Sequence, residues 1–427
     1  MATTGELPMT ATTEQGGPAT QPRAWLPVAA ALFGIGWGAN QITPMLLVYR
    51  HALGLGTGTL EAVFGVYALG LIPGLLIAGP LSDARGRRAV VVPAVAMSLV
   101  ASVLLTGATL NVGLLFAGRL LAGVSSGAAF GAGTAWLRET SLPPLGTASD
   151  HTAARRAAVA MTAGFALGPL AAGIVAQWAP SPTVLPYLPH LAVMAVVWVL
   201  LRRAPETITA GRPRVPRLST PGLRSRRFRT VVAPMAPWVF AAPAIAFALL
   251  PSLAGAGQAS NGIALTAAIA ALCALAGILV QPLARRLDLR PGRNRAAAAG
   301  LLVLAAGLVL GAVTAQAREV WLLVPSALVL GCAYGMCLVA GLVEVQRLAG
   351  SNGAAGLTAI YYALTYLGFA APYLIVLGTH VASYAVLLAV AALLALGTAA
   401  LITRAAASEQ TAGEQTAACA GRSQAAG

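Results

Sequence analysis

The sequence contains no lysine, and its 427 residues include only 12 Asp and Glu residues, so all 27 basic residues are arginines. Charged residues make up 9% of the chain and hydrophobic residues 58%, and the mean hydropathy is +0.79. Soluble globular domains carry about 25% charged residues, so this composition excludes an ordinary soluble protein. It predicts an integral membrane protein. Heavy alanine use with arginine in place of lysine favours a bacterial source, and hence a bacterial cell membrane.

Cysteine and histidine are also scarce, with four of each. The cysteines are Cys273, Cys332, Cys337 and Cys419; none has Cys-x-x-Cys spacing, and three lie in apolar runs where they fill space. The histidines are scattered. These patterns argue against a disulfide framework, a metal centre, a cofactor and an enzyme active site. The sequence also lacks a phosphate-binding loop with its lysine, which argues against ATP hydrolysis as an energy source.

The net charge of +15 could indicate a nucleic-acid partner, but the arginines follow another pattern. Arg50 and Arg318 fall in loops on one side of the predicted spans, Arg119 falls within a span, and the other 24 of the 27 fall on the opposite side. Arginine collects in cytoplasmic loops of membrane proteins. We therefore expect both termini to be cytoplasmic, and we expect the positive charge to set the orientation of the protein in the membrane.

Twelve apolar runs are long enough to cross a bilayer, which takes about 20 residues. We place them at 25–49, 58–80, 89–109, 112–137, 155–178, 185–203, 230–252, 258–282, 295–315, 319–343, 354–377 and 380–403. The segment 204–229 carries seven arginines and four prolines, which predicts a basic cytoplasmic linker. The domains predicted are a disordered tail at 1–24, an N-terminal bundle at 25–203, the linker, a C-terminal bundle at 230–403 and a disordered tail at 404–427.

The two halves share short sequences. Gly-Pro-Leu at 79–81 has a counterpart in Gln-Pro-Leu at 281–283, and Gly-Phe-Ala at 164–166 has one at 368–370. Duplicated six-helix bundles would enclose a binding cavity near the membrane midplane, reached alternately from either side. Chance similarity between helices rich in Ala, Gly and Leu is the alternative explanation.

The turn at 79–88 reads Gly-Pro-Leu-Ser-Asp-Ala-Arg-Gly-Arg-Arg and joins two uncharged apolar runs. Gly79 would let two backbones approach closely, and Gly86 can adopt φ > 0 where the chain reverses. The spacing resembles the loop between helices two and three of the major facilitator superfamily, Gly-x-Leu-Ala-Asp-x-x-Gly-Arg-Arg/Lys, with Ser82 in place of Ala. The resemblance implies an all-α membrane protein of 12 transmembrane helices in two six-helix bundles.

The same resemblance implies a conformational latch at the cytoplasmic end. Asp83 lies where the helix gives way to the turn, and it can pair with Arg87, Arg88 or, from a later span, Arg138. In the superfamily such a latch favours the outward-open state and breaks when the bundles rock. A generic positive loop on the cytoplasmic side is the plain alternative.

Arg119 is the one strongly charged residue well inside a predicted span, where insertion costs about 2.5 to 3.5 kcal/mol. It should face the bundle interior or a wet cavity, although an arginine nearer the surface could snorkel. With Gly123 and Ser125 it resembles a second superfamily motif, tied to proton or substrate handling, from which Ala122 departs. Glu61 is our candidate proton carrier because it could approach Arg119; a solvated loop carboxylate is the alternative.

The fifth span contains Gly-Phe-Ala-Leu-Gly-Pro-Leu-Ala-Ala-Gly at 164–173. Gly164, Gly168 and the residue at 172 recur every four positions, which predicts close helix packing, and Pro169 permits a kink. The stretch resembles the Gly-x-x-x-Gly-Pro-x-x-Gly-Gly motif of drug/proton antiporters in the superfamily, with Gly173 matching its last glycine. Small-residue packing alone would also produce such a helix.

Polar and aromatic residues that interrupt apolar spans are the candidates for the cavity lining. Trp37, Asn40 and Gln41 do so in the first span, and Tyr362 and Tyr366 share one face of the eleventh. Buried amides need water or a polar partner, which favours a cavity. Few charges in the spans favour an amphipathic substrate that is neutral or weakly cationic.

The sequence thus predicts a monomeric secondary transporter, with proton-coupled efflux of a hydrophobic or amphipathic drug or metabolite by alternating access. Facilitated or proton-coupled uptake of a small nutrient is the alternative, and a membrane sensor that does not transport is a third reading.

Overall fold

The structure, a computed structural model, describes residues 21, 23–208, 222–287, 294–349 and 354–425, and this part of the chain is helical without a strand. The helices are α1 (Trp25–Asn40), α2 (Ile42–Leu53), α3 (Thr57–Arg85), α4 (Arg87–Thr106), α5 (Gly113–Ser141), α6 (Asp150–Trp178), α7 (Leu188–Leu201), α8 (Ala233–Ala244), α9 (Leu250–Leu253), α10 (Gly262–Leu279), α11 (Gln281–Leu287), α12 (Arg295–Ala317), α13 (Leu323–Ala349), α14 (Ala354–Tyr366), α15 (Ala371–Gly378) and α16 (Tyr384–Ala425).

The predicted spans are present as helices. Among the described residues, ten helical segments are long and apolar enough to cross a membrane, and Leu185–Leu201 is a shorter apolar helix. The first predicted span is α1 followed by α2, divided at Gln41. Pro44 explains the division, because it has no N–H to donate to the carbonyl four residues earlier and its ring clashes there.

The seventh span, Phe228–Leu253, is also irregular. It runs as a π-helical turn at Phe228–Val232, then α8, a second π-helical turn at Ile245–Leu249, and α9. Four prolines lie in this stretch, and each removes a backbone donor.

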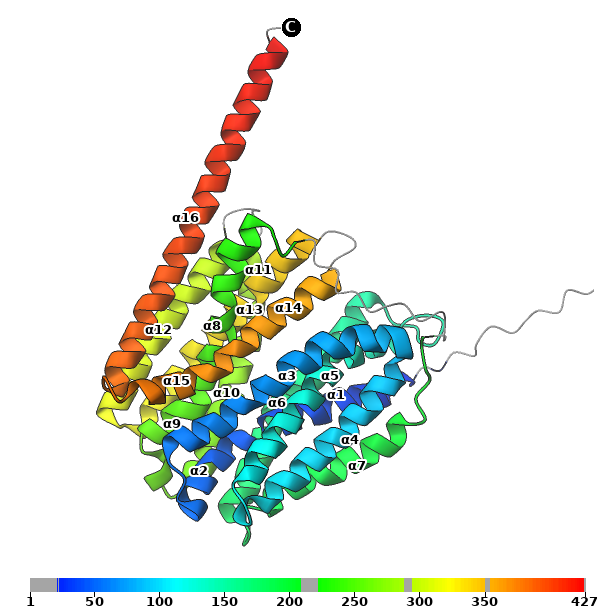
Figure 1. The fold of residues 1–427 in the computed structure, drawn as a ribbon, viewed down its shortest axis with the longest axis vertical. Coiled ribbons are helices and arrows are strands. Elements are labelled where there is room, and N and C mark those ends of the chain that lie inside the picture. The colour runs from blue at the N-terminus through cyan, green and yellow to red at the C-terminus, as the bar shows by residue number, and fades with distance from the viewer. Residues whose placement is uncertain (1–20, 22, 209–221, 288–293, 350–353, 426–427) are drawn as a thin grey trace, which may run out of the picture.

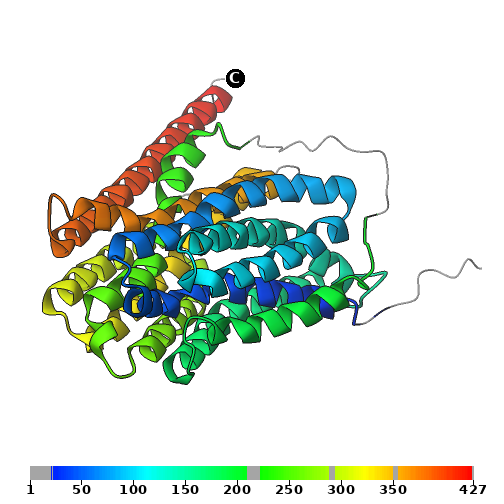
Figure 2. The same cartoon turned by 60° about the horizontal axis from the view of Figure 1, so that its bottom comes forward.

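The helices pack in two groups. In the first, α5 packs against α3 and α4, and α1 packs against α6 and α7; in the second, α12 packs against α13 and α16, and α13 packs against α8 and α10. Figures 1 and 2 show these two groups side by side. Contacts of α10 with α2 and α6, and of α3 with α14 and α15, join them. We call the two sets the first group (α1–α7) and the second group (α8–α16).

Successive helices run in opposite directions, so the arginine-bearing turns between them fall at one end of both groups. Helix α3 ends at Arg85, α4 begins at Arg87 and α5 has Arg138 in its last turn. We call this the arginine-rich end. The opposite end, where Arg50 and Arg318 lie, is the arginine-poor end.

The last helix, α16, continues to Ala425, beyond position 403 where the sequence analysis ended the last span and began a disordered tail. Figure 1 shows it extending past the other helices. Residues 404–425 are rich in Ala, Gln and Glu, which have high helix propensity. Residues 1–20 and 22 of the predicted tail, and residues 209–221 of the predicted linker, fall outside the described residues.

Candidate functional site

Arg119 lies in the interior of the first group and is 0% exposed, so it does not snorkel to the surface. Its Nη1 donates to the carbonyl oxygen of Ala39 at 3.0 Å, and its Nη2 to that of Phe64 at 3.3 Å. The guanidinium carbon lies 4.4 Å from the centre of the Tyr67 ring. Its Nε has no hydrogen-bond partner, and no carboxylate among the described residues pairs with it. Arg119 is thus a buried cation satisfied only by carbonyls and ring faces.

Glycine allows α3 and α5 to hold this arrangement. A Cβ at Gly123 would lie 2.0 Å from the carbonyl oxygen of Tyr67, and one at Gly70 would lie 2.1 Å from that of Leu120. Any larger side chain at either position would force the helices apart. The close contact therefore fixes Arg119 of α5 against Phe64 and Tyr67 of α3.

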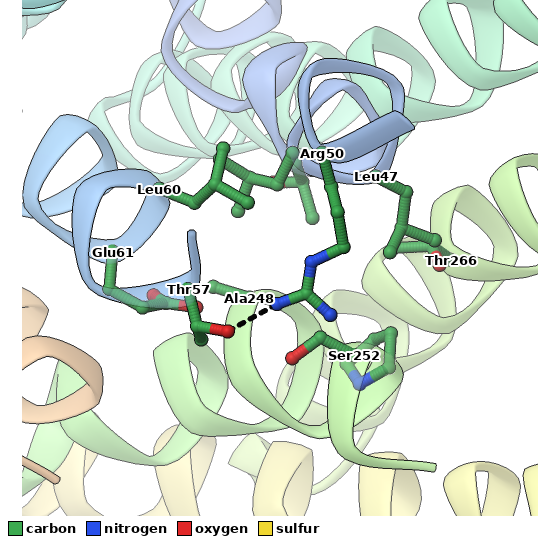
Figure 3. A pocket seen from close by; sticks show the side chains of 11 residues that line it. Leu47, Arg50, Thr57, Leu60, Glu61, Ala248, Ser252 and Thr266 are labelled. Atoms are coloured by element: carbon green, nitrogen blue, oxygen red, sulfur yellow. Dashed lines mark hydrogen bonds between the residues drawn. The ribbon is translucent and has the colours of Figure 1, made fainter. Parts of the chain in front are cut away.

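Glu61 lies in a separate pocket at the arginine-poor end (Figure 3). It is 2% exposed, so it is not a solvated loop carboxylate, and its Oε2 has no hydrogen-bond partner. The cation facing the same pocket is Arg50, whose Nη2 donates to Thr57 Oγ1. The expected pairing of Glu61 with Arg119 is not found: the cation in the Glu61 pocket is Arg50, and Arg119 is held by carbonyls and rings instead.

The Glu61 pocket lies between the two groups. Its cavity measures about 10 Å³, and Ala248, Pro251, Ser252 and Thr266 complete the wall from the second group. The hydroxyl of Thr43, which also lines it, is buried without a partner. A cavity of about this size holds one water molecule. Closure of the groups at this end thus encloses a carboxylate with very little room around it.

An aromatic cluster fills the contact between the groups deeper in the protein. It consists of Phe64, Tyr67, Phe240, Phe247, Tyr334, Tyr366 and Phe369. The rings of Phe64 and Phe369 stack at 5.1 Å between centres across the groups, and those of Phe240 and Tyr366 stack at 4.4 Å within the second group. Tyr366 was predicted at the cavity and belongs to this cluster. Tyr362 instead lies half-buried beside Tyr361.

The polar residues of the first span occupy other places. Gln41 was predicted to line the cavity, but it is fully buried and its Nε2 donates to Ser102 Oγ at 3.1 Å. Ser102 Oγ lies 2.8 Å from Nδ1 of His190, a buried histidine that the sequence analysis did not single out. This network lies within the first group and ties down the break between α1 and α2. Its members are 61 to 88 residues apart in sequence, so no local pattern reveals them.

Asn40 and Trp37 lie at the contact between α1 and α6. Asn40 Nδ2 is 3.5 Å from the carbonyl oxygen of Phe165. A Cβ at Gly164 would lie 2.1 Å from the carbonyl oxygen of Phe33, and one at Gly168 2.7 Å from that of Trp37. These two glycines of the fifth span therefore serve close packing against α1, as their spacing predicts.

The remaining residues of the fifth-span motif, Pro169 and Gly173, lie further along the same helix, toward its C-terminal end. Pro169 is inside α6, which is continuous from Asp150 to Trp178. A Cβ at Gly173 would lie 2.4 Å from Cβ of Ala267 in α10. Helix α6 thus packs on α1 with one face and meets the second group with another.

Arg87 is the centre of the charge cluster at the arginine-rich end. It is 8% exposed, and its guanidinium pairs with Asp83 at 2.5 Å and with Glu139 at 2.8 Å. Its Nη1 also donates to Ser82 Oγ at 2.8 Å. The sequence left Arg87, Arg88 and Arg138 open as partners of Asp83, and Arg87, four residues away, is the one that pairs with it. The pair of Arg87 with Glu139, 52 residues away, was not predicted.

Glu206 completes this cluster by accepting from the backbone N–H groups of Arg87 and Arg88, each at 3.0 Å. A carboxylate at a helix N-terminus satisfies free donors there and the helix dipole favours it. Gly86, with φ of 101°, makes room for it, since a Cβ would lie 2.6 Å from Glu206 Oε2.

Three predicted latch residues differ from expectation. A Cβ at Gly79 would meet no atom within 4 Å, so Gly79 marks no close approach here. The Arg88 side chain is exposed and only its backbone joins the cluster. Arg138 pairs with Asp150 at 2.6 Å, because both lie on the exposed side of the arginine-rich end.

The second group carries a similar cluster at the same end. Arg227 pairs with Glu344, and its Nη2 donates to Asn294 Oδ1 at 2.7 Å. Glu344 also lies 3.4 Å from Arg347. Each group therefore has its own arginine-carboxylate cluster.

A match to a protein-family model identifies the class. Residues 26–372 match the model of the Major Facilitator Superfamily. This covers most of the chain, and the chain belongs to that superfamily of membrane transporters. The protein is thus a multi-pass membrane protein with the major facilitator fold. A search of curated proteins found no match.

Solved structures with the same fold are distant in sequence. A POT family transporter in complex with 5-aminolevulinic acid has a TM-score of 0.72 and 14% identity, over 89% of this chain and 95% of that one. A variant of the nucleoside transporter NupG has a TM-score of 0.68 and 13% identity, over 90% and 99%. A variant of the peptide transporter POT has a TM-score of 0.74 and 14% identity, over 90% and 96%.

Proposed function

We propose that this protein is a proton-coupled secondary transporter that exports an amphipathic small molecule by alternating access. The observation that carries the proposal is Glu61, a carboxylate that is 2% exposed, has no partner on Oε2 and lies between the two groups. An unpaired charged carboxylate is costly to bury. Closure at the arginine-poor end therefore favours protonated Glu61, so Glu61 takes up a proton before the groups close at this end.

The proposed orientation has the arginine-rich end in the cytoplasm of a bacterial cell, since 24 of 27 arginines are predicted there. In an exporter driven by the inward proton gradient, Glu61 then takes up this proton from the outside while the groups are separated at the arginine-poor end, and it gives the proton up toward the cytoplasm after they have closed there. The charge cluster around Arg87 is proposed to act as the cytoplasmic latch that holds α3, α4 and α5 together during this motion.

Export is favoured over uptake by the resemblance of the fifth span to the motif of drug/proton antiporters; two of its glycines, Gly164 and Gly168, pack closely against α1. Uptake is the second candidate, because two of the structural neighbours are named as a peptide and a nucleoside transporter. At 13% to 14% identity those neighbours indicate only a shared fold.

Inverted membrane vesicles with an acidic interior separate the two directions. An exporter releases vesicle protons when its substrate is added, so a pH-sensitive dye should report collapse of the gradient with at least one of four probes: an aromatic cation, an aromatic acid, a nucleoside or a dipeptide. Glu61→Gln should lose this response, and Glu319→Gln, which changes an exposed carboxylate, should keep it. Accumulation in right-side-out vesicles alone would reject export.

A further inference from the structure

Arg119 lies at the centre of the first group, and no carboxylate in the described part of the chain pairs with it. Ionisable side chains within a membrane almost always pair with one another or with carbonyls, and they mark substrate or ion pathways. Among the described residues, its hydrogen-bond and ring partners are the carbonyls of Ala39 and Phe64 and the rings of Tyr67 and Phe64. The buried carboxylate that could have neutralised Arg119, Glu61, lies in the pocket of Arg50 instead.

The free donors of Arg119 have a defined geometry. A guanidinium has five N–H donors, and only two are engaged here, one on each Nη. The Nε–H is buried and has no partner. An Nε–H together with a neighbouring Nη–H forms the edge on which arginine binds a carboxylate through two parallel hydrogen bonds. The unsatisfied part of Arg119 therefore matches a carboxylate.

The surroundings of Arg119 define the rest of the ligand. The rings of Phe64 and Tyr67, against which Arg119 lies, contact Phe247, Tyr366 and Phe369 of the second group. Separation of the groups breaks these ring contacts and exposes flat apolar faces on both sides. A flat apolar body inserted between them would restore the lost stacking. Arg119 itself is 0% exposed, so a ligand reaches it only after this separation.

We propose that the transported ligand is an aromatic organic anion, whose carboxylate pairs with Arg119 while its ring system stacks on the aromatic cluster. This deepens the proposed function, on which it rests, by naming the substrate class. It also replaces the neutral or weakly cationic substrate expected from the sequence, since Arg119 repels a cation and no carboxylate among the residues that the structure describes pairs with it to offset that repulsion.

Binding to the full-length protein in nanodiscs tests the charge preference directly. The probes are 2-naphthoate, its neutral amide 2-naphthamide and the cation 2-naphthylmethylammonium, which share one ring system. Calorimetric titration should give a dissociation constant for naphthoate at least tenfold below those of the amide and the amine. Equal or tighter binding of the amide or the amine would overturn the proposal, as would binding of none of the three.

Variants test whether Arg119 is the source of the preference for naphthoate. Arg119→Gln should bind naphthoate no better than the amide, whereas Arg318→Gln, which removes an exposed arginine at the arginine-poor end, should leave the tenfold preference intact. Should Arg119→Gln fail to fold, Arg119→Lys keeps the charge and should keep part of the preference. Tyr67→Leu should weaken all three probes alike by removing a stacking surface. An acid preference that survives in Arg119→Gln would overturn the assignment.

Failure of this proposal differs from failure of the proposed function. Naphthoate preference without proton-driven flux would leave the anion site standing and reject proton coupling. Proton-driven export of the amine would uphold the transporter and overturn the anion site.

Discussion

Gln177 and Ser260 join the two groups of helices at the arginine-poor end. Gln177 Nε2 donates to the carbonyl oxygen of Ser260 at 2.9 Å, and its Oε1 accepts from the backbone N–H groups of Ile263 and Ala264, each at 3.2 Å. The first turn of α10 is therefore capped by a side chain of α6. Because these bonds cross between the groups, they must break whenever the groups separate at this end.

Gln177→Leu should weaken closure at the arginine-poor end. The change removes three hydrogen bonds and leaves two helix donors without a protein acceptor. In a background free of native cysteines, we expect Ser252→Cys in the Glu61 pocket to react severalfold faster with a membrane-impermeant maleimide. Gln258→Leu, at an exposed glutamine in the same region, is the control and should leave the rate unchanged. Equal rates for the two variants would show that the bonds of Gln177 do not hold the groups closed.

Arg87→Gln should destabilise the arginine-rich end more than Arg85→Gln. Arg87 is 8% exposed and bridges Asp83 and Glu139, whereas the side chain of Arg85 is exposed. Loss of hydrogen bonds to charged groups costs about 1.5 to 3 kcal/mol. Thermal unfolding in detergent should show a clear drop in midpoint for Arg87→Gln only. Similar midpoints for both variants would contradict the central role given to Arg87.

Gly164→Ala should disrupt packing between α1 and α6. Its Cβ would lie 2.1 Å from the carbonyl oxygen of Phe33, a contact that backbone must move to relieve. Overpacking of this kind costs about 1 to 3 kcal/mol. Gly397→Ala is the matched control, since a Cβ there meets no atom within 4 Å and alanine favours a helix. We expect lower thermal stability and lower transport for Gly164→Ala, and neither loss for Gly397→Ala. Unchanged stability of Gly164→Ala would show that the packing of α1 against α6 does not require a glycine at this position.

Ser102→Ala should destabilise the first group. It takes a shared partner from Gln41 and His190, both fully buried, and a buried polar group left unpaired costs about 1 to 3 kcal/mol. Ser181→Ala, at an exposed position, should have little effect on the unfolding midpoint. Equal midpoints would mean that this network does not secure the break between α1 and α2.

The fold could be predicted because it depends on features that are local in sequence. Apolar runs and the side on which each arginine falls determine the spans and their direction. The division of the first span was missed, although Pro44 marks it, because hydropathy alone does not register a backbone break. The end of α16 was missed for a related reason: the residues that follow the apolar run are polar but still favour a helix.

The candidate site was predicted in part because sequence gives the depth of a residue in a span better than the face that it occupies. Burial of Arg119 was expected from its place inside a span, with snorkelling as the alternative. Glu61 was expected either near Arg119 or as a solvated loop carboxylate, and it is instead buried beside Arg50, because the position of a residue at a span end does not show which neighbouring helix covers it. For the same reason the Arg87 pair with Asp83 was predictable at four residues' separation, and its pair with Glu139 was not.

The most direct test of the account compares two kinds of flux through Glu61→Gln in proteoliposomes, with the probe that discharges the proton gradient in wild type. Glutamine imitates the protonated side chain, so the variant should still exchange labelled for unlabelled probe across the membrane. It should fail to accumulate probe when a proton gradient is imposed, while Glu319→Gln accumulates as wild type does. Accumulation by Glu61→Gln at the wild-type level would contradict the central claim that this buried carboxylate couples proton movement to transport.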